Sequence, residues 1–176
     1  MSGHNKWSKI KHKKAISDSK RSKIYSKLVK LIQSESKNAK GDVSSAGLRT
    51  AIDKAKEENM PKETIDRAVK KGATSDSASL EYVAYEAYGP GGCAIIIEGL
   101  TDNKNRIAAE VKHILSKKGL TLATPGSASW AFEKTLEEWI PKTPCPISEE
   151  DSAKLEELFD ELEENDDVQE IYTNAE

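Results

Sequence analysis

Lysine, tryptophan and histidine side chains crowd the first forty residues of this chain. Residues 1–40 contain eleven Lys and one Arg against only Asp18 and Glu35. Lysine and arginine neutralise phosphates and release the counterions that condense on a nucleic acid, and flat aromatic rings stack on exposed bases. The pattern predicts nucleic-acid binding through His4, Lys6, Trp7, Lys9, Lys11, His12, Lys13, Lys14, Lys20, Arg21, Lys23 and Lys27.

The two halves of the chain carry opposite charge. Residues 1–72 contain 19 Lys and Arg against 8 Asp and Glu, whereas residues 73–176 contain 8 against 22. The formal net charge of −3 hides this division. An asymmetry of this kind predicts two domains with different roles. We therefore expect a basic domain at 1–72, a small polar linker at 73–80 and an acidic domain at 81–176.

Three helices are expected to position the basic residues. Residues 3–14 lack a helical apolar period and predict an extended arm, whereas a helix is predicted over 18–36. Ser44 or Ser45 is predicted to cap a second helix, and the third begins near Pro61 and ends at Gly72 in the left-handed conformation. The inward-facing positions are Ile24, Leu28, Leu31 and Ile32, then Leu48, Ile52 and Ala55, and finally Ile65, Ala68 and Val69.

The second half switches to alternating strands and helices. Residues 81–88 and 93–100 predict a hairpin around Gly89-Pro-Gly-Gly92. Asp102 is expected to cap a helix that ends before Gly119, and Ser148 to cap a later one. Short strands are predicted at 120–124, 128–133, from 139 and at 168–173. The expected fold class is α+β, a three-helix basic domain followed by a ferredoxin-like α/β domain.

Other kinds of chemistry find little support. His4 and His12 have no acidic or thiolate partner nearby, so we expect no metal site. Cys93 and Cys145 predict free thiols and a reducing compartment. We find no nucleophile, base and orienting residue in a set, so we expect neither an enzyme nor a cofactor. No apolar run approaches the ~20 residues of a membrane span, which predicts a cytoplasmic protein without a membrane partner.

Several features have a simpler structural interpretation. Trp7 either stacks on a base or packs against the helices. The lysines of helix 18–36, Lys30 included, either contact phosphates or form a solvated face. Arg106 follows the capping residues of its helix and is placed to reach RNA. The oligomeric state is left open by the sequence.

The motifs of the chain resemble those of the YebC/PmpR family. The opening Gly3-His4-x-Lys6-Trp7-x-x-Ile10-Lys11-His12-x-Lys14 and then Asp18-x-Lys20-Arg21-x-Lys23 match that family in order and spacing. Asn59-Met-Pro-Lys62, Tyr88-Gly-Pro-Gly-Gly92, Thr101-Asp-Asn-Lys-Asn-Arg106 and Asp167-Val-Gln-Glu-Ile-Tyr-Thr-Asn174 extend the resemblance over nearly the whole chain. One departure is that Phe132-Glu-Lys134 runs within a few residues into Ile140, where family members usually carry an inserted third domain.

The resemblance implies a non-enzymatic regulator of gene expression. The family includes proteins named as DNA-binding transcription regulators, ribosome-associated translation factors and the mitochondrial translational activator of cytochrome oxidase. We expect a translation factor that binds ribosomal RNA and relieves stalled elongation, because a flexible cationic segment suits structured RNA. The alternative is a transcriptional regulator that binds duplex DNA. Against this alternative, Lys62, Arg67 and Lys70 of the third helix are phosphate-type contacts without an Asn or Gln pair for adenine.

Overall fold

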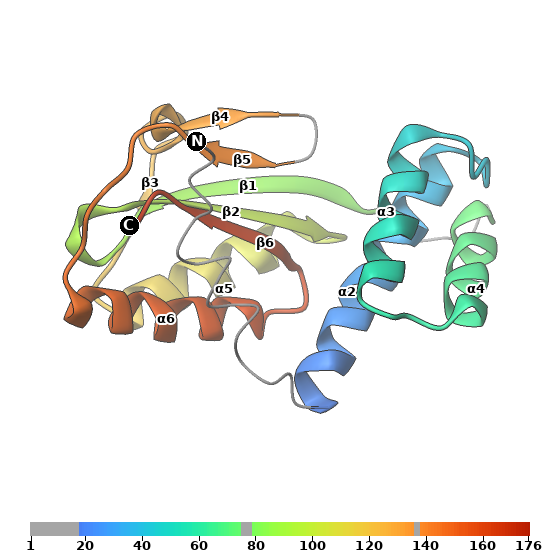
Figure 1. Cartoon of the computed structure of the whole chain (residues 1–176), viewed down its shortest axis with the longest axis horizontal. Helices are drawn as coiled ribbons and strands as arrows, with labels where there is room; N and C mark the ends of the chain where they lie inside the picture. Colours follow the sequence, from blue (N-terminus) through green and yellow to red (C-terminus); the bar gives the residue numbers. More distant parts are fainter. Residues whose placement is uncertain (1–17, 75–78, 136–137) are drawn as a thin grey trace. The chain divides into compact units, whose positions relative to one another are not determined.

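The described chain folds into two compact units. The computed structural model describes residues 18–74, 79–135 and 138–176. The helical unit extends to Glu81, and the α/β unit comprises Tyr82–Glu176. Figure 1 labels the elements of both units. We describe each unit by itself.

The helical unit contains three helices. They are α2 (Asp18–Asn38), α3 (Ala46–Glu57) and α4 (Lys62–Ala73). Of the two predicted caps for α3, Ser45 is the one that accepts a hydrogen bond from the N–H of Leu48. Pro61 is the N-cap residue of α4, so the helix begins next to Pro61 as predicted.

The core of the helical unit follows the predicted apolar pattern closely. Its fully buried members are Ile32, Leu48, Ala51, Ala55, Met60, Ile65 and Ala68. Leu28, Leu31, Ile52 and Val69 pack against them. Ile24 was expected on the same inward face, but it lies outside this cluster and lines a pocket.

The prediction for Gly72 was wrong. Gly72 lies inside α4, is buried, and is not among the described residues with positive φ. Its role is close packing against α2, because a Cβ there would lie 2.8 Å from both the Cα of Gln33 and the Cβ of Ser36. Ser36 donates a hydrogen bond of 2.7 Å to the carbonyl of Val69 at the same crossing.

The α/β unit contains a four-stranded antiparallel sheet in the order β3-β1-β2-β6. Its strands are β1 (Glu81–Tyr88), β2 (Ala94–Thr101), β3 (Leu122–Ala123) and β6 (Val168–Thr173). β1 and β2 are adjacent and joined through the short helical turn η1 (Pro90–Gly92), so the predicted hairpin is confirmed. β3 pairs with β1 through two residues only, fewer than the predicted strand 120–124.

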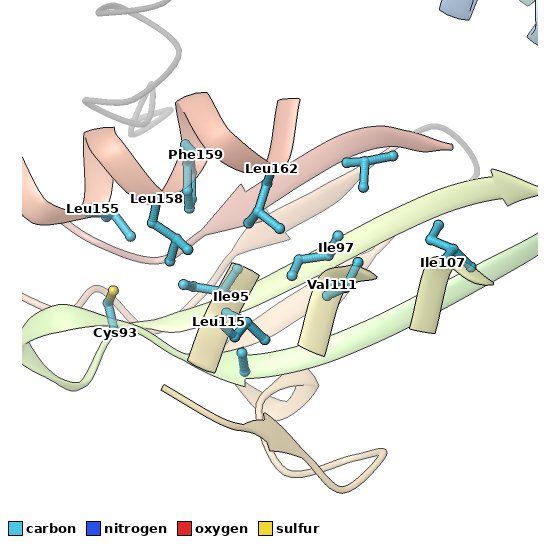
Figure 2. Packing of buried hydrophobic residues seen from close by; sticks show 12 residues of the cluster. Cys93, Ile95, Ile97, Ile107, Val111, Leu115, Leu155, Leu158, Phe159 and Leu162 are labelled. Atoms are coloured by element: carbon cyan, nitrogen blue, oxygen red, sulfur yellow. The ribbon is translucent and has the colours of Figure 1, made fainter. Parts of the chain in front are cut away.

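Helices α5 (Lys104–Lys117) and α6 (Glu149–Glu163) cover one face of the sheet (Figure 1). Figure 2 shows the resulting core, in which residues of both helices meet the β2 side chains Ile95 and Ile97. On α5 the buried residues are Ile107, Val111 and Leu115, at the spacing of one helical face. α6 is capped by Ser148 as predicted. The α+β fold class is thus confirmed. The element order differs from the ferredoxin-like one, because β1 and β2 follow each other directly in the chain, whereas a ferredoxin-like domain has a helix between its first two strands.

A small hairpin covers part of the other face. It consists of β4 (Phe132–Lys134) and β5 (Trp139–Pro141), and Phe132 packs with Ile96 of β2. The predicted strand 128–133 begins instead as the helical turn η2 (Ser129–Ala131). Its loop is held by Glu86, whose carboxylate accepts hydrogen bonds from the N–H groups of Gly126, Ala128 and Ser129 at 2.6–2.8 Å.

Candidate nucleic-acid interface

Most of the predicted contact residues that the structure describes lie on helix α2. Lys20, Lys23 and Lys27 recur at i, i+3 and i+7, so they lie along one side of the helix. Lys30 continues the series, and we call these four residues the lysine stripe. Lys20 is exposed and the other three are half-buried. Ile32 is buried on a different side of α2, so the lysine stripe does not lie on the side that Ile32 turns toward the core.

Arg21 is separated from the lysine stripe. One residue of helix turns the chain by about 100°, so Arg21 emerges beside the apolar side of α2. There it lines a pocket of about 260 Å³ between the start of α2 and the turn that joins α3 to α4. The other residues that line it are Ile24, Tyr25, Glu58 and Asn59. We call it the Asn59 pocket.

Tyr25 ties the two walls of the Asn59 pocket together. Its hydroxyl donates to the backbone carbonyl of Asn59 at 2.9 Å and lies 3.2 Å from the carbonyl oxygen of Glu58. The contact bridges 34 positions of sequence. Since a tyrosine has only two side-chain torsions, the tether fixes the turn against α2 at low entropic cost.

Asn59 closes α3 in a left-handed conformation, with φ of 60°. Its N–H donates to the carbonyl of Lys56, and the N–H of Met60 donates to the carbonyl of Ala55. These two bonds form a Schellman motif, whose left-handed position is usually glycine and sometimes asparagine. Both bonds of the motif are made by backbone groups, so the exposed carboxamide of Asn59 is held at the pocket without taking part in the motif.

The remaining predicted contacts lie outside the described residues. They are His4, Lys6, Trp7, Lys9, Lys11, His12, Lys13 and Lys14. The structure therefore brings Lys20, Lys23 and Lys27 together on α2 and sets Arg21 apart. Asn59 was quoted only as part of a family motif, and neither Tyr25 nor Asn59 was predicted as a contact residue, because nothing in the spacing of two residues 34 apart shows that they meet.

Arg106 occupies a different environment from the one expected of an RNA contact. Its Nη2 lies 2.6 Å from Asp167 and 2.7 Å from Asp102, and these carboxylates, that of Asp167 most, raise the pKa of the guanidinium. Asp167 is buried and also accepts from the hydroxyl of Thr101. Asp102 was predicted to cap α5, but Asn103 does so by accepting from the N–H of Arg106. Arg106 therefore joins β2, α5 and the start of β6.

Two further properties of the described residues bear on other functions. Within the ranges that the structure describes, no group of three or more His, Cys, Asp or Glu is placed to hold a metal ion. Over those same ranges, no helix has the length and apolar character to cross a membrane. Cys93 is fully buried and Cys145 is half-buried, and neither is in a disulfide.

Comparison with known proteins gives a consistent result. The model of the TACO1/YebC protein N-terminal domain matches residues 5–75, and that of the TACO1/YebC second and third domain matches 80–137 and 134–175. A protein of Thermoanaerobacter pseudethanolicus, named a probable transcriptional regulatory protein, is 38% identical over 239 aligned residues that cover 100% of this chain and 97% of that protein.

Two other similar proteins extend the comparison. A probable transcriptional regulatory protein of Petrotoga mobilis is 46% identical, covering 100% of this chain and 71% of that protein. The crystal structure of the conserved hypothetical protein Aq1575 from Aquifex aeolicus superposes with a TM-score of 0.84 at 31% identity, over 98% of this chain and 97% of that one.

The aligned length also shows where the chain differs from longer relatives. The 239 aligned residues of the Thermoanaerobacter protein exceed the 176 residues of this chain. The match to the second and third domain is split at residues 134–137, at the connection between β4 and β5. The chain therefore lacks residues that this relative carries, as the short connection from Lys134 to Ile140 predicted. With both domain models matched along its length, the chain belongs to the TACO1/YebC family.

Proposed function

We propose that this protein is a nucleic-acid-binding regulator of gene expression, which acts through the N-terminal residues and helix α2. The observation that carries the proposal is the lysine stripe on α2, within a segment 1–72 whose Lys and Arg outnumber its Asp and Glu by 19 to 8. Relatives named as probable transcriptional regulatory proteins support the regulatory role. Their names favour duplex DNA as the target.

Ribosomal RNA is the second candidate target, and one observation favours it. The exposed residues of α4 include Lys62, Arg67 and Lys70, and this helix contains no Asn or Gln that could form a bidentate contact to adenine. A helix of this composition binds phosphates better than it reads base pairs. In this second form the protein is a ribosome-associated factor that relieves stalled elongation.

Salt dependence of binding tests the shared part of the proposal. Removal of one lysine–phosphate interaction should lower the slope of log K against log salt by about 0.9 on duplex DNA or about 0.7 on a single strand. Replacing Lys20, Lys23 and Lys27 by Gln should therefore reduce the slope by roughly 2–3. The control replaces Lys112, Lys117 and Lys154 of the α/β unit, which removes the same charge. Equal effects of the two triple variants would refute an interface on α2.

Competition between duplex DNA and ribosomal RNA then distinguishes the two forms of the proposal, a transcriptional regulator and a translation factor. Full-length protein is offered labelled duplex DNA together with unlabelled ribosomal RNA at matched salt. A transcriptional regulator retains sequence-selective DNA binding, and its deletion changes messenger levels at the bound promoters. A translation factor co-sediments with ribosomes, and its deletion slows synthesis of a restricted set of proteins at constant messenger level.

A further inference from the structure

We propose that the Asn59 pocket binds one unpaired nucleobase and that Arg21 binds the adjoining phosphate. This inference rests on the proposed function and adds a selectivity that the lysine stripe lacks. Lysines on a helix neutralise any phosphate backbone and carry no information about the bases. A pocket with an aromatic ring and an amide at its rim can distinguish a base that has left its stack from one that is paired.

The size of the pocket suits a single ring system. Its volume is about 260 Å³, whereas pockets for drug-sized ligands occupy roughly 300–1,000 Å³. The lining combines the apolar side chain of Ile24 with the ring of Tyr25. The Tyr25 hydroxyl is engaged with the turn carbonyls and part of the residue packs against the core of the helical unit, so the part that lines the pocket is held in a fixed position. Aromatic rings of this kind stack on any base.

Arg21 provides the charge that a nucleotide needs. It is exposed and lines the pocket from the first turns of α2. Within the described ranges its guanidinium forms no ion pair, in contrast to Arg106, which is held by two carboxylates. Guanidinium groups bind phosphate with two parallel hydrogen bonds. Glu58 also lines the pocket and disfavours phosphate inside it, which places the phosphate at the Arg21 side.

Asn59 is the residue that distinguishes this pocket from a structural turn. Glycine is the usual residue at the left-handed position of a Schellman motif because it lacks a Cβ. The chain keeps a carboxamide at that position, and among the described residues this side chain has no hydrogen-bond partner. A carboxamide offers both donors and an acceptor, which is the pattern that a base edge requires.

The substitution Asn59→Gly separates folding from recognition. Glycine adopts φ of 60° without strain, so the variant should melt at the same temperature as the wild type or higher, while it loses the amide. The probes are a short RNA duplex with one bulged adenosine and the same duplex fully paired. The wild type should prefer the bulged duplex by about tenfold or more, because one base stacks on Tyr25 and forms hydrogen bonds with the carboxamide of Asn59. Asn59→Gly should lose the part of this preference that the amide supplies, while it binds the paired duplex unchanged.

Further variants and probes complete the test. Arg21→Gln should weaken binding to the bulged duplex more than Arg49→Gln, a control at an exposed arginine of α3. The same pair of probes in DNA identifies the source of the base: a preference in both supports a pocket that reads the base alone, and one in RNA only supports a pocket that also reads the 2′-hydroxyl. An unchanged preference in Asn59→Gly, or equal binding of both duplexes by the wild type, would overturn the pocket and leave the proposed function standing. Failure to bind either duplex would instead overturn the proposed function.

Discussion

Gly72 controls how closely α4 approaches α2, so Gly72→Ala is a direct test of the helical unit. The added methyl group would lie 2.8 Å from the Cα of Gln33 and from the Cβ of Ser36, and it would also meet the carbonyl oxygen of Gln33. Cα and carbonyl atoms belong to the backbone of α2 and cannot turn aside. The helices must therefore separate, which also strains the hydrogen bond from Ser36 to the carbonyl of Val69.

The expected cost follows from three contributions. Overpacking a tight contact costs typically about 1–3 kcal/mol, and a weakened buried hydrogen bond adds about 1 kcal/mol. Alanine in a helix recovers about 1 kcal/mol relative to glycine. Gly72→Ala should thus destabilise the helical unit by roughly 1–3 kcal/mol, where each kcal/mol corresponds to ~4–8 °C in a unit of this size.

The assay follows the two units separately in the full-length protein. In a Trp7→Phe background the remaining tryptophans are Trp130 and Trp139, which both belong to the α/β unit. Tryptophan fluorescence therefore reports unfolding of the α/β unit alone, whereas circular dichroism reports unfolding of both units. Gly72→Ala should lower the midpoint seen by circular dichroism and leave the fluorescence midpoint unchanged. The control is Gly47→Ala in α3, where the atoms nearest to the added methyl group belong to the flexible side chain of Glu35. If Gly72→Ala proves as well tolerated as Gly47→Ala, the tight crossing is refuted.

Three further changes test the α/β unit. Partial burial raises the pKa of Glu86, but hydrogen bonds from the loop N–H groups outweigh it and lower the pKa from its ordinary value. The stabilisation is present above the ordinary pKa and is lost as the pH falls through the folded pKa. Thermal melts of Glu86→Gln should therefore fall below wild type at neutral pH and converge with it in acid. Burial raises the pKa of the fully enclosed Cys93 thiol, so mass spectrometry after brief alkylation should find Cys145 modified first. Equal labelling of the two cysteines would contradict the burial of Cys93. Asp167→Asn removes the buried carboxylate that binds Arg106 and should lower the fluorescence midpoint; an unchanged midpoint would mean that the link between β2, α5 and β6 is dispensable.

Much of the fold could be predicted because local signals and burial agree. Ser45 and Ser148 cap their helices, and the apolar spacing of α4 and α6 matches their buried faces. Gly72 was misread because a glycine near a helix end has two physical uses, a left-handed cap or a close approach, and only the position of α2 distinguishes them. The cap of α5 was misplaced by one residue because Asp102 and Asn103 both have capping side chains, and Asp102 is taken by Arg106.

The candidate site was predictable in composition but not in geometry. Charge counting identifies the lysines of α2, since an excess of Lys and Arg on an amphipathic helix is visible in the sequence alone. The separation of Arg21 from the lysine stripe depends on where the apolar side of α2 is buried. The Asn59 pocket requires the contact of Tyr25 with a turn 34 residues away, and tertiary contacts of this kind leave no periodic trace.

The β4–β5 connection accounts for how this chain keeps its fold without residues that longer relatives carry. The two strands pair through Phe132 with Pro141, Glu133 with Ile140 and Lys134 with Trp139, and Thr135 and Glu138 exchange hydrogen bonds across the turn. Both ends of any insertion there leave the hairpin side by side, and loop tips of this kind tolerate insertions. The apolar cores of both units are built from residues outside the turn. The proposed binding by α2 and the Asn59 pocket can therefore be tested in this chain directly, independently of any contribution from the additional residues.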